Sequence, residues 1–176
     1  MPLPECTPPE SSAELPLAIP AEIYVQPGES HLVTKPSVLR TVLGSCVGVA
    51  FWAPERGAAA LCHPMLPRFP VKSQGTLSLA ASRRYVDFAI RDLARRFDKL
   101  GVRRAAIQVK LFGGGDVLLV SNDAARPTVG RLNYEMAIRV LREEGFEVVA
   151  SSLGGTSGLH IQFNSVTGEV LLRRLN

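Results

Sequence analysis

Two short apolar segments separated by a proline–glycine turn constrain the fold of this chain most strongly. Residues 46–52 are apolar and alternate larger with smaller side chains, which is typical of a buried β-strand. The sequence Pro-Glu-Arg-Gly at 54–57 favours a turn, and residues 58–62 are again short and apolar. The pattern predicts a β-hairpin whose first and last residues lie side by side.

The remaining apolar periodicity predicts further strands and two helices around this hairpin. Alternation favours strands, whereas spacings of three and four between apolar residues favour helices, the second of which is expected to bury Tyr134, Ala137, Ile138 and Leu141. The strands are expected over 37–43, 106–111, 146–150, 159–163 and 170–175, and the helices over 80–100 and 133–144. Hairpins at both ends of this order favour an α+β layered fold with mixed sheets over a doubly wound parallel sheet.

Length and composition indicate one globular domain over residues 21–176, preceded by a flexible, proline-rich tail over 1–20. The chain has 176 residues, 46% of them hydrophobic, and a net charge of +4, which is too mildly basic for a dedicated nucleic-acid binder. No uncharged apolar run approaches the roughly 20 residues of a membrane span. Because the first residues lack both lysine and a long apolar run, we expect no secretory signal and a cytoplasmic location.

The distribution of cysteine and histidine points to one candidate site. Cys46 follows a Gly44-Ser45 break between two predicted strands, where a sharply turned backbone can aim N–H groups at a carbonyl oxygen. The predicted hairpin brings His63 close to Cys46, which is the nucleophile–base arrangement of cysteine chemistry. Of the other two histidines, His31 is expected to lie in a loop and His160 on the surface of a strand.

Simpler interpretations of the same residues remain open. Cys46 can be a small buried apolar residue, as Cys62 is expected to be. The hairpin geometry also permits a Cys46–Cys62 disulfide, although a reducing cytoplasm disfavours it. Cys62 and His63 have no second pair at metal-ligand spacing, so the sequence does not predict a zinc site.

Several motifs, taken together, resemble the CheD family of chemoreceptor glutamine deamidases. The most specific is Leu-Gly-Ser-Cys-Val at 43–47, followed by His-Pro-Met-Leu-Pro at 63–67. Further matching segments occur in the same order as in the family, namely 84–90, 110–114, 130–133, 154–158 and 167–170. The resemblance covers roughly residues 23–175.

The resemblance implies a fold, a reaction and roles for single residues. The implied fold is a three-layer α/β/β sandwich with two main helices, similar to a bacterial toxin deamidase. Cys46 matches the family's nucleophile, His63 its general base, and Thr41 the residue that orients the histidine, with Ser45 as a second hydroxyl near by. The expected oxyanion donors are backbone N–H groups from Gly44 to Cys46, worth about 3 kcal/mol each in comparable sites.

The substrate implied by the resemblance is a set of glutamine side chains on the cytoplasmic helices of methyl-accepting chemotaxis receptors. Hydrolysis of glutamate methyl esters by the same route is also implied, and no cofactor or metal is needed. Two other functions compete with this one. The chain can be a binding module that regulates receptors or a CheC-type phosphatase, or a cysteine hydrolase that acts on other proteins.

Overall fold

The computed structural model describes residues 20–70, 77–117 and 127–175, so nearly all of the predicted N-terminal tail lies outside the described residues. The described residues form nine strands and three α-helices. The strands are β1 (Ala21–Tyr24), β2 (Ser30–Val33), β3 (Ser37–Leu43), β4 (Val47–Ala53), β5 (Ala58–Cys62), β6 (Gln108–Gly113), β7 (Glu147–Leu153), β8 (Gly158–Asn164) and β9 (Val170–Leu175). The helices are α1 (Leu79–Ser82), α2 (Val86–Lys99) and α3 (Val129–Glu143).

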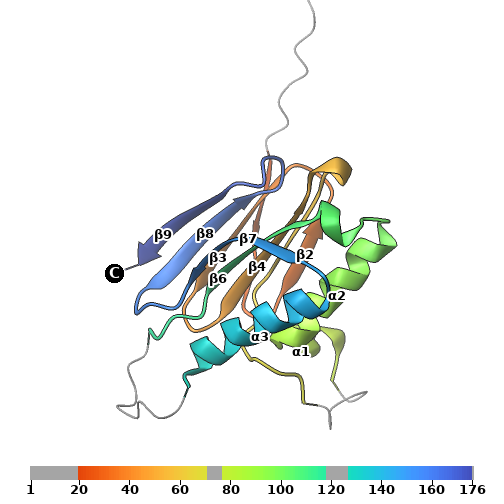
Figure 1. The fold of residues 1–176 in the computed structure, drawn as a ribbon. Helices are drawn as coiled ribbons and strands as arrows, with labels where there is room; N and C mark the ends of the chain where they lie inside the picture. Colours follow the sequence, from red (N-terminus) through yellow and green to blue (C-terminus); the bar gives the residue numbers. More distant parts are fainter. Residues whose placement is uncertain (1–19, 71–76, 118–126, 176) are drawn as a thin grey trace, which may run out of the picture.

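The strands form two sheets that pack face to face, with helices on one side (Figure 1). The four-stranded sheet has the order β1-β3-β8-β9, and the five-stranded sheet has the order β2-β5-β4-β6-β7. Both sheets are mixed, because β1 runs parallel to β3 and β6 runs parallel to β7 while the other pairs are antiparallel. The predicted α+β class and its α/β/β sandwich are confirmed.

Two apolar cores separate the three layers. One lies between the five-stranded sheet and helices α2 and α3, and the other lies between the two sheets. Strands β4 and β5 contribute to both cores, which explains why almost every residue in them is buried and why their sequences are apolar without interruption. Strands β3 and β8 alternate buried and partly exposed residues because only one of their faces meets the core.

Helix α3 is fixed at both ends by residues with a capping preference. The hydroxyl of Thr128 accepts a hydrogen bond from Arg131 N at 3.2 Å, and Gly145 takes a left-handed conformation just beyond the last turn. The prediction placed the helix start at Asn133, four residues too late. The predicted buried face was partly wrong as well, because Ile138 is exposed while Asn133 and Val140 are buried.

The single helix predicted over 80–100 is wrong, since the chain divides it into α1 and α2. Tyr85 is extended and forms an isolated bridge with Leu66, and the carbonyl of Arg84 accepts from Met65 N and Leu66 N. These long-range bonds compete with helical ones, which a pattern of apolar spacings does not register. The break also ties the loop after β5 to the start of α2.

Two short strands were not predicted. Strand β1 lies beside β3, and β2 pairs with β5 at the edge of the larger sheet. His31 was expected in a loop but belongs to β2, where its Nε2 lies 3.1 Å from a carboxylate oxygen of Glu29. No helix in the described part of the chain is both long enough and apolar enough to cross a membrane.

Candidate active site

Cys46 and His63 lie at the same end of two neighbouring strands. The β4–β5 register pairs Val49 with Cys62, and Val47 N donates to Pro64 O at 3.3 Å one step further on. Alternation along each strand turns both side chains toward the four-stranded sheet, since Cys46 packs against the inter-sheet core and His63 follows Leu61 of that core by two residues. The predicted hairpin is confirmed, and both residues lie at its open end.

The chain makes room for this arrangement at Gly48. Continuing the β4–β5 register places Gly48 opposite His63, on the face that meets the other sheet. A Cβ atom at Gly48 would lie 2.9 Å from Leu43 Cδ1 and 3.2 Å from Ile161 Cδ1. A side chain at this position would press on the ends of these two buried side chains, so glycine eases the close approach of the two sheets beside the histidine.

His63 is oriented by a buried chain of hydrogen bonds. Thr41, on β3 of the opposite sheet, places its Oγ1 2.7 Å from His63 Nδ1 and 2.7 Å from the carbonyl oxygen of Val25. Because that carbonyl can only accept, the hydroxyl donates to Val25 and accepts from Nδ1–H. Nδ1 therefore carries the proton in the neutral ring, and Nε2 keeps a lone pair that can accept one.

The backbone of His63 is held as firmly as its ring. His63 N donates to Glu29 O at 2.9 Å, and His63 O accepts from Gly28 N at 2.7 Å. Both partners lie in the turn between β1 and β2, the segment that also follows Val25. His63, which is 2% exposed, is thus held by residues that the sequence did not connect with it.

Burial favours the neutral form of both candidate reactive groups. Removal from solvent raises the pKa of the Cys46 thiol above its ordinary value. Removal from solvent also lowers the pKa of His63, against a smaller raising effect of the Val25 carbonyl. Near pH 7 the site therefore holds a neutral thiol and a neutral imidazole, and the imidazole is free to accept a proton.

The loop that carries Cys46 is held by its carbonyl groups. Gly44 O accepts from Gly115 N at 2.9 Å, Ser45 O from Asn133 Nδ2 at 2.9 Å, and Cys46 O from Gly114 N at 2.8 Å. The N–H groups of Ser45 and Cys46, in contrast, donate to no other described residue. With its acceptors engaged and its donors available, the loop can supply hydrogen bonds to a negative oxygen.

Two of the predicted site residues differ in their surroundings. Thr41 is fully buried and contacts the imidazole, whereas Ser45 is exposed and its hydroxyl bonds to no described residue. Thr41 is therefore the hydroxyl that orients His63. Cys62 faces the helix-side core, where burial raises the pKa of its thiol to about 12, and both Cys46 and Cys62 are free thiols.

Sequence reasoning missed Asn133 as a member of the site. The residue was noted only as part of a motif at the start of a helix, yet its amide lies under the Cys46 loop. The available signal was an asparagine at a position where the helical periodicity requires an apolar side chain. A buried amide in a helix needs polar partners, and here they are backbone carbonyls of the loops after β3 and β5.

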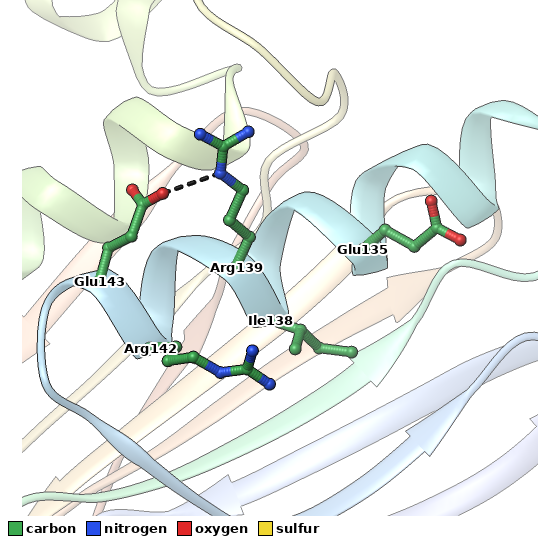
Figure 2. A pocket seen from close by; sticks show the side chains of 5 residues that line it. All are labelled: Glu135, Ile138, Arg139, Arg142 and Glu143. Atoms are coloured by element: carbon green, nitrogen blue, oxygen red, sulfur yellow. Dashed lines mark hydrogen bonds and ion pairs between the residues drawn. The ribbon is translucent and has the colours of Figure 1, made fainter.

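A separate hollow of about 470 Å³ lies on the outer side of α3, as Figure 2 shows. It is lined by Glu135, Ile138, Arg139, Arg142 and Glu143, of which Arg139 and Glu143 form an ion pair at 2.8 Å. None of the predicted site residues lines this hollow. Among the described residues, no group of three or more histidine, cysteine, aspartate or glutamate side chains is arranged to hold a metal ion.

An α/β/β sandwich with a half-buried cysteine and a hydroxyl-bonded histidine at one end of a hairpin has the arrangement expected of a cysteine-dependent hydrolase. The family model described as CheD chemotactic sensory transduction matches residues 65–174 of this chain, a segment that begins just after His63. The chain belongs to the CheD family.

Individual proteins extend this comparison over most of the chain. A probable chemoreceptor glutamine deamidase CheD 2 of Geobacter sulfurreducens is 44% identical over 154 residues, which are 88% of this chain and 90% of that protein. A probable chemoreceptor glutamine deamidase CheD of Maridesulfovibrio salexigens is 34% identical over 158 residues, covering 87% and 91%. The crystal structure of the Bacillus licheniformis hypothetical protein YfiH has a TM-score of 0.46 and 16% identity, covering 72% of this chain and 51% of that one.

Proposed function

We propose that this chain is a chemoreceptor glutamine deamidase in which Cys46 is the nucleophile and His63 the general base. The observation that carries the proposal is the hydrogen-bond chain from Val25 through Thr41 to His63 Nδ1, which leaves Nε2 free to accept a proton at the end of the hairpin that carries Cys46. The names of the curated relatives agree with this activity.

The first half of the reaction forms a thioester and releases ammonia. His63 Nε2 takes the proton from Cys46 Sγ, and the sulfur attacks the side-chain carbonyl carbon of a glutamine. The N–H groups of Ser45 and Cys46 stabilise the negative oxygen that forms. The imidazolium then returns its proton to the amide nitrogen, which leaves as ammonia.

The second half of the reaction regenerates the enzyme. His63 takes a proton from water, the hydroxide attacks the thioester, and the thiolate leaves and recovers the proton from the imidazolium. The balance is glutamine plus water giving glutamic acid plus ammonia, which ionise to glutamate and ammonium. A glutamate methyl ester would enter the same route with methanol as the leaving group. Neither half needs a metal or a redox partner.

The receptor helices that carry such glutamines lie in the cytoplasm, so we place the protein there as well. The loop reaches solvent on one side, because Ser45 is exposed and Cys46 is half-buried. A glutamine side chain that projects from a helix is long enough to enter such a site, whereas a backbone amide within a helix is held away by its own hydrogen bonds.

The test is mass spectrometry of a receptor cytoplasmic fragment incubated with the full chain and with its Cys46→Ala and His63→Ala variants. We expect a gain of about 1 Da on particular glutamine peptides and release of ammonia with the unaltered protein, and neither with the two variants. Cys62→Ala is the matched control, because it removes a thiol that lies outside the site and should leave deamidation intact. Deamidation by Cys46→Ala, or its absence in the unaltered protein across several receptors, would refute the proposal.

A further inference from the structure

We propose that Asn133 is a positioning residue that sets the direction of the Cys46 amide N–H and holds the Cys46 and His63 loops together. The inference rests on the proposed deamidase function. Asn133 lies in the second turn of α3 and its side chain has no exposed surface. Its Nδ2 donates to Ser45 O and to Met65 O, each at 2.9 Å.

These two carbonyls belong to the two segments that carry the reactive side chains. Ser45 directly precedes Cys46, and Met65 follows His63 by two residues. A side-chain amide has two N–H donors on one planar nitrogen, and Asn133 directs one toward each segment. The helix therefore ties the nucleophile loop to the base loop through a single planar group.

The geometry of the peptide bond converts this tie into control of the oxyanion site. In a trans peptide unit the C=O and the N–H point in opposite directions. The carbonyl of Ser45 and the N–H of Cys46 belong to the same unit, so a donor that holds this carbonyl also fixes the direction of that N–H. The bond polarises the unit as well, which makes the N–H a stronger donor to a negative oxygen.

Asn133 differs in kind from the other groups that hold this loop. The carbonyls of Gly44 and Cys46 are held by backbone N–H groups of Gly115 and Gly114, which no side-chain substitution removes. Among the described residues, Asn133 is the one whose side chain bonds to a carbonyl of the loop 44–46.

The packing around α3 is arranged so that this amide reaches the loop. Gly130, one turn before Asn133, lies directly against Gly114, and a Cβ atom on Gly130 would lie 2.5 Å from Gly114 O. The absence of a side chain there lets the start of the helix approach the backbone under Cys46. Gly130 thus lets the helix approach the loop closely, and Asn133 then supplies the N–H groups that bond to the loop carbonyls.

A purely stabilising role fits one observation poorly. Asn133 Oδ1 is buried and bonds to no other described residue. A buried acceptor without a partner costs about 1–3 kcal/mol of stability, which partly offsets what the two donors contribute. An amide that is kept in spite of this cost indicates that its donors are needed for the placement of the loops.

The test compares Asn133→Ala and Asn133→Asp with Val140→Ala, all measured well below their melting temperatures so that each protein is folded. Asn133→Asp keeps the shape but, when ionised, has no donor for the two carbonyls. Val140→Ala removes buried volume from the same helix about two turns beyond Asn133. Two quantities are measured, namely kcat and KM for deamidation of a receptor fragment, and the amide resonance of Cys46 by nitrogen–proton NMR.

We expect both Asn133 variants to lower kcat about 10- to 100-fold with KM changed less than about threefold, because the loss is confined to transition-state stabilisation. The Cys46 amide resonance should move or broaden in both. Val140→Ala should lower the melting temperature and leave kcat and the resonance unchanged. An Asn133→Ala protein with unaltered kcat and Cys46 resonance would overturn the inference, and so would equal losses in Val140→Ala.

The two arms separate this inference from the proposed function. If the unaltered protein deamidates no receptor, the proposed function fails, and the Cys46 resonance still decides whether Asn133 positions the loop. If deamidation occurs and the Asn133 variants match the unaltered protein in kcat, the positioning role alone is refuted.

Discussion

Replacing Thr41 with valine is expected to lower kcat of deamidation about tenfold while the protein stays folded at moderate temperature. Valine has nearly the shape of threonine but can neither accept from His63 Nδ1–H nor donate to Val25 O. A hydrogen bond from a neutral group contributes about 1 kcal/mol net, and one from an ionised group roughly twice as much. His63 carries a positive charge only during the reaction, so the difference of about 1 to 1.5 kcal/mol is lost from the transition state. About 1.4 kcal/mol corresponds to a factor of ten in rate.

The same substitution also has a cost in the resting protein. It leaves a buried carbonyl and a buried ring N–H without their partner, which should lower the free energy of unfolding by about 1–3 kcal/mol. The assay is therefore kcat and KM on a receptor fragment together with urea unfolding. Thr41→Ser is the matched control, since it keeps the hydroxyl and loses only a methyl group. The reasoning is refuted if Thr41→Val retains full kcat, or if Thr41→Ser is impaired as strongly.

Three further predictions concern the loop, the thiols and the pH dependence of stability. Gly113→Ala should lower the free energy of unfolding by about 1–3 kcal/mol and should also lower activity. The reason is that Gly113 has a φ of 92° and that a Cβ atom there would overlap the carbonyl oxygen of Cys46. Gly57→Ala is the control, because Gly57 has a φ of 57° with open space around it and should affect stability alone. In a Cys6→Ser background, iodoacetamide should modify Cys46 well before Cys62, whose pKa is about 12, and equal rates on the native protein would contradict the described burial. The pKa of His63 in the folded protein lies below its ordinary value of 6.5, so the unfolded chain binds this proton more readily as the pH falls. The contribution of the neutral imidazole to stability is therefore fully present above pH 6.5. It should be lost as the pH falls through the folded-state pKa. Urea unfolding of the unaltered protein and of His63→Gln across this range measures the effect, and equal pH slopes in the two proteins would exclude His63 as its source.

Strand positions were predictable wherever a local signal marked both ends. Strands 37–43, 58–62 and 170–175 were predicted to the residue, because each alternates or is wholly apolar and is bounded by glycine, proline or a turn. The hairpin then follows from the four-residue turn between its strands. Because the hairpin is local in sequence, the position of His63 near the Cys46 loop could also be predicted.

Elements that depend on distant partners were predicted less well. Strands β1 and β2 have only four residues each, too few for a period to be visible, and they exist because β3 and β5 offer unpaired edges. The helix break at 83–85 exists because residues 65 and 66 bond to the carbonyl of Arg84. In both cases the competing interaction comes from a part of the chain that a local pattern does not include.

The candidate site divides along the same line. Cys46 and His63 belong to one hairpin, so their types and their spacing could be recognised in the sequence. The Val25 carbonyl and the backbone groups at 28 and 29 carry no side-chain signal. They belong to the site because the turn between β1 and β2 lies beside His63 and Thr41. Thr41 was expected from the resemblance, and its contact with the imidazole needed the second sheet.

This division has a mechanistic consequence. The groups that would exchange protons and form bonds come from one local hairpin, whereas the groups that orient them come from the opposite sheet, from the turn after β1 and from α3. Loss of a reacting group should remove the covalent route altogether, while loss of an orienting group should reduce the rate by the value of one or two hydrogen bonds. Thr41 bonds to the His63 imidazole, whereas Asn133 bonds to the carbonyl groups of Ser45 and Met65, so the two residues share no hydrogen-bond partner. Their effects on the activation free energy should therefore add in the Thr41→Val, Asn133→Ala double variant, and a double variant no slower than the worse single one would mean that both residues act through one common displacement of the hairpin.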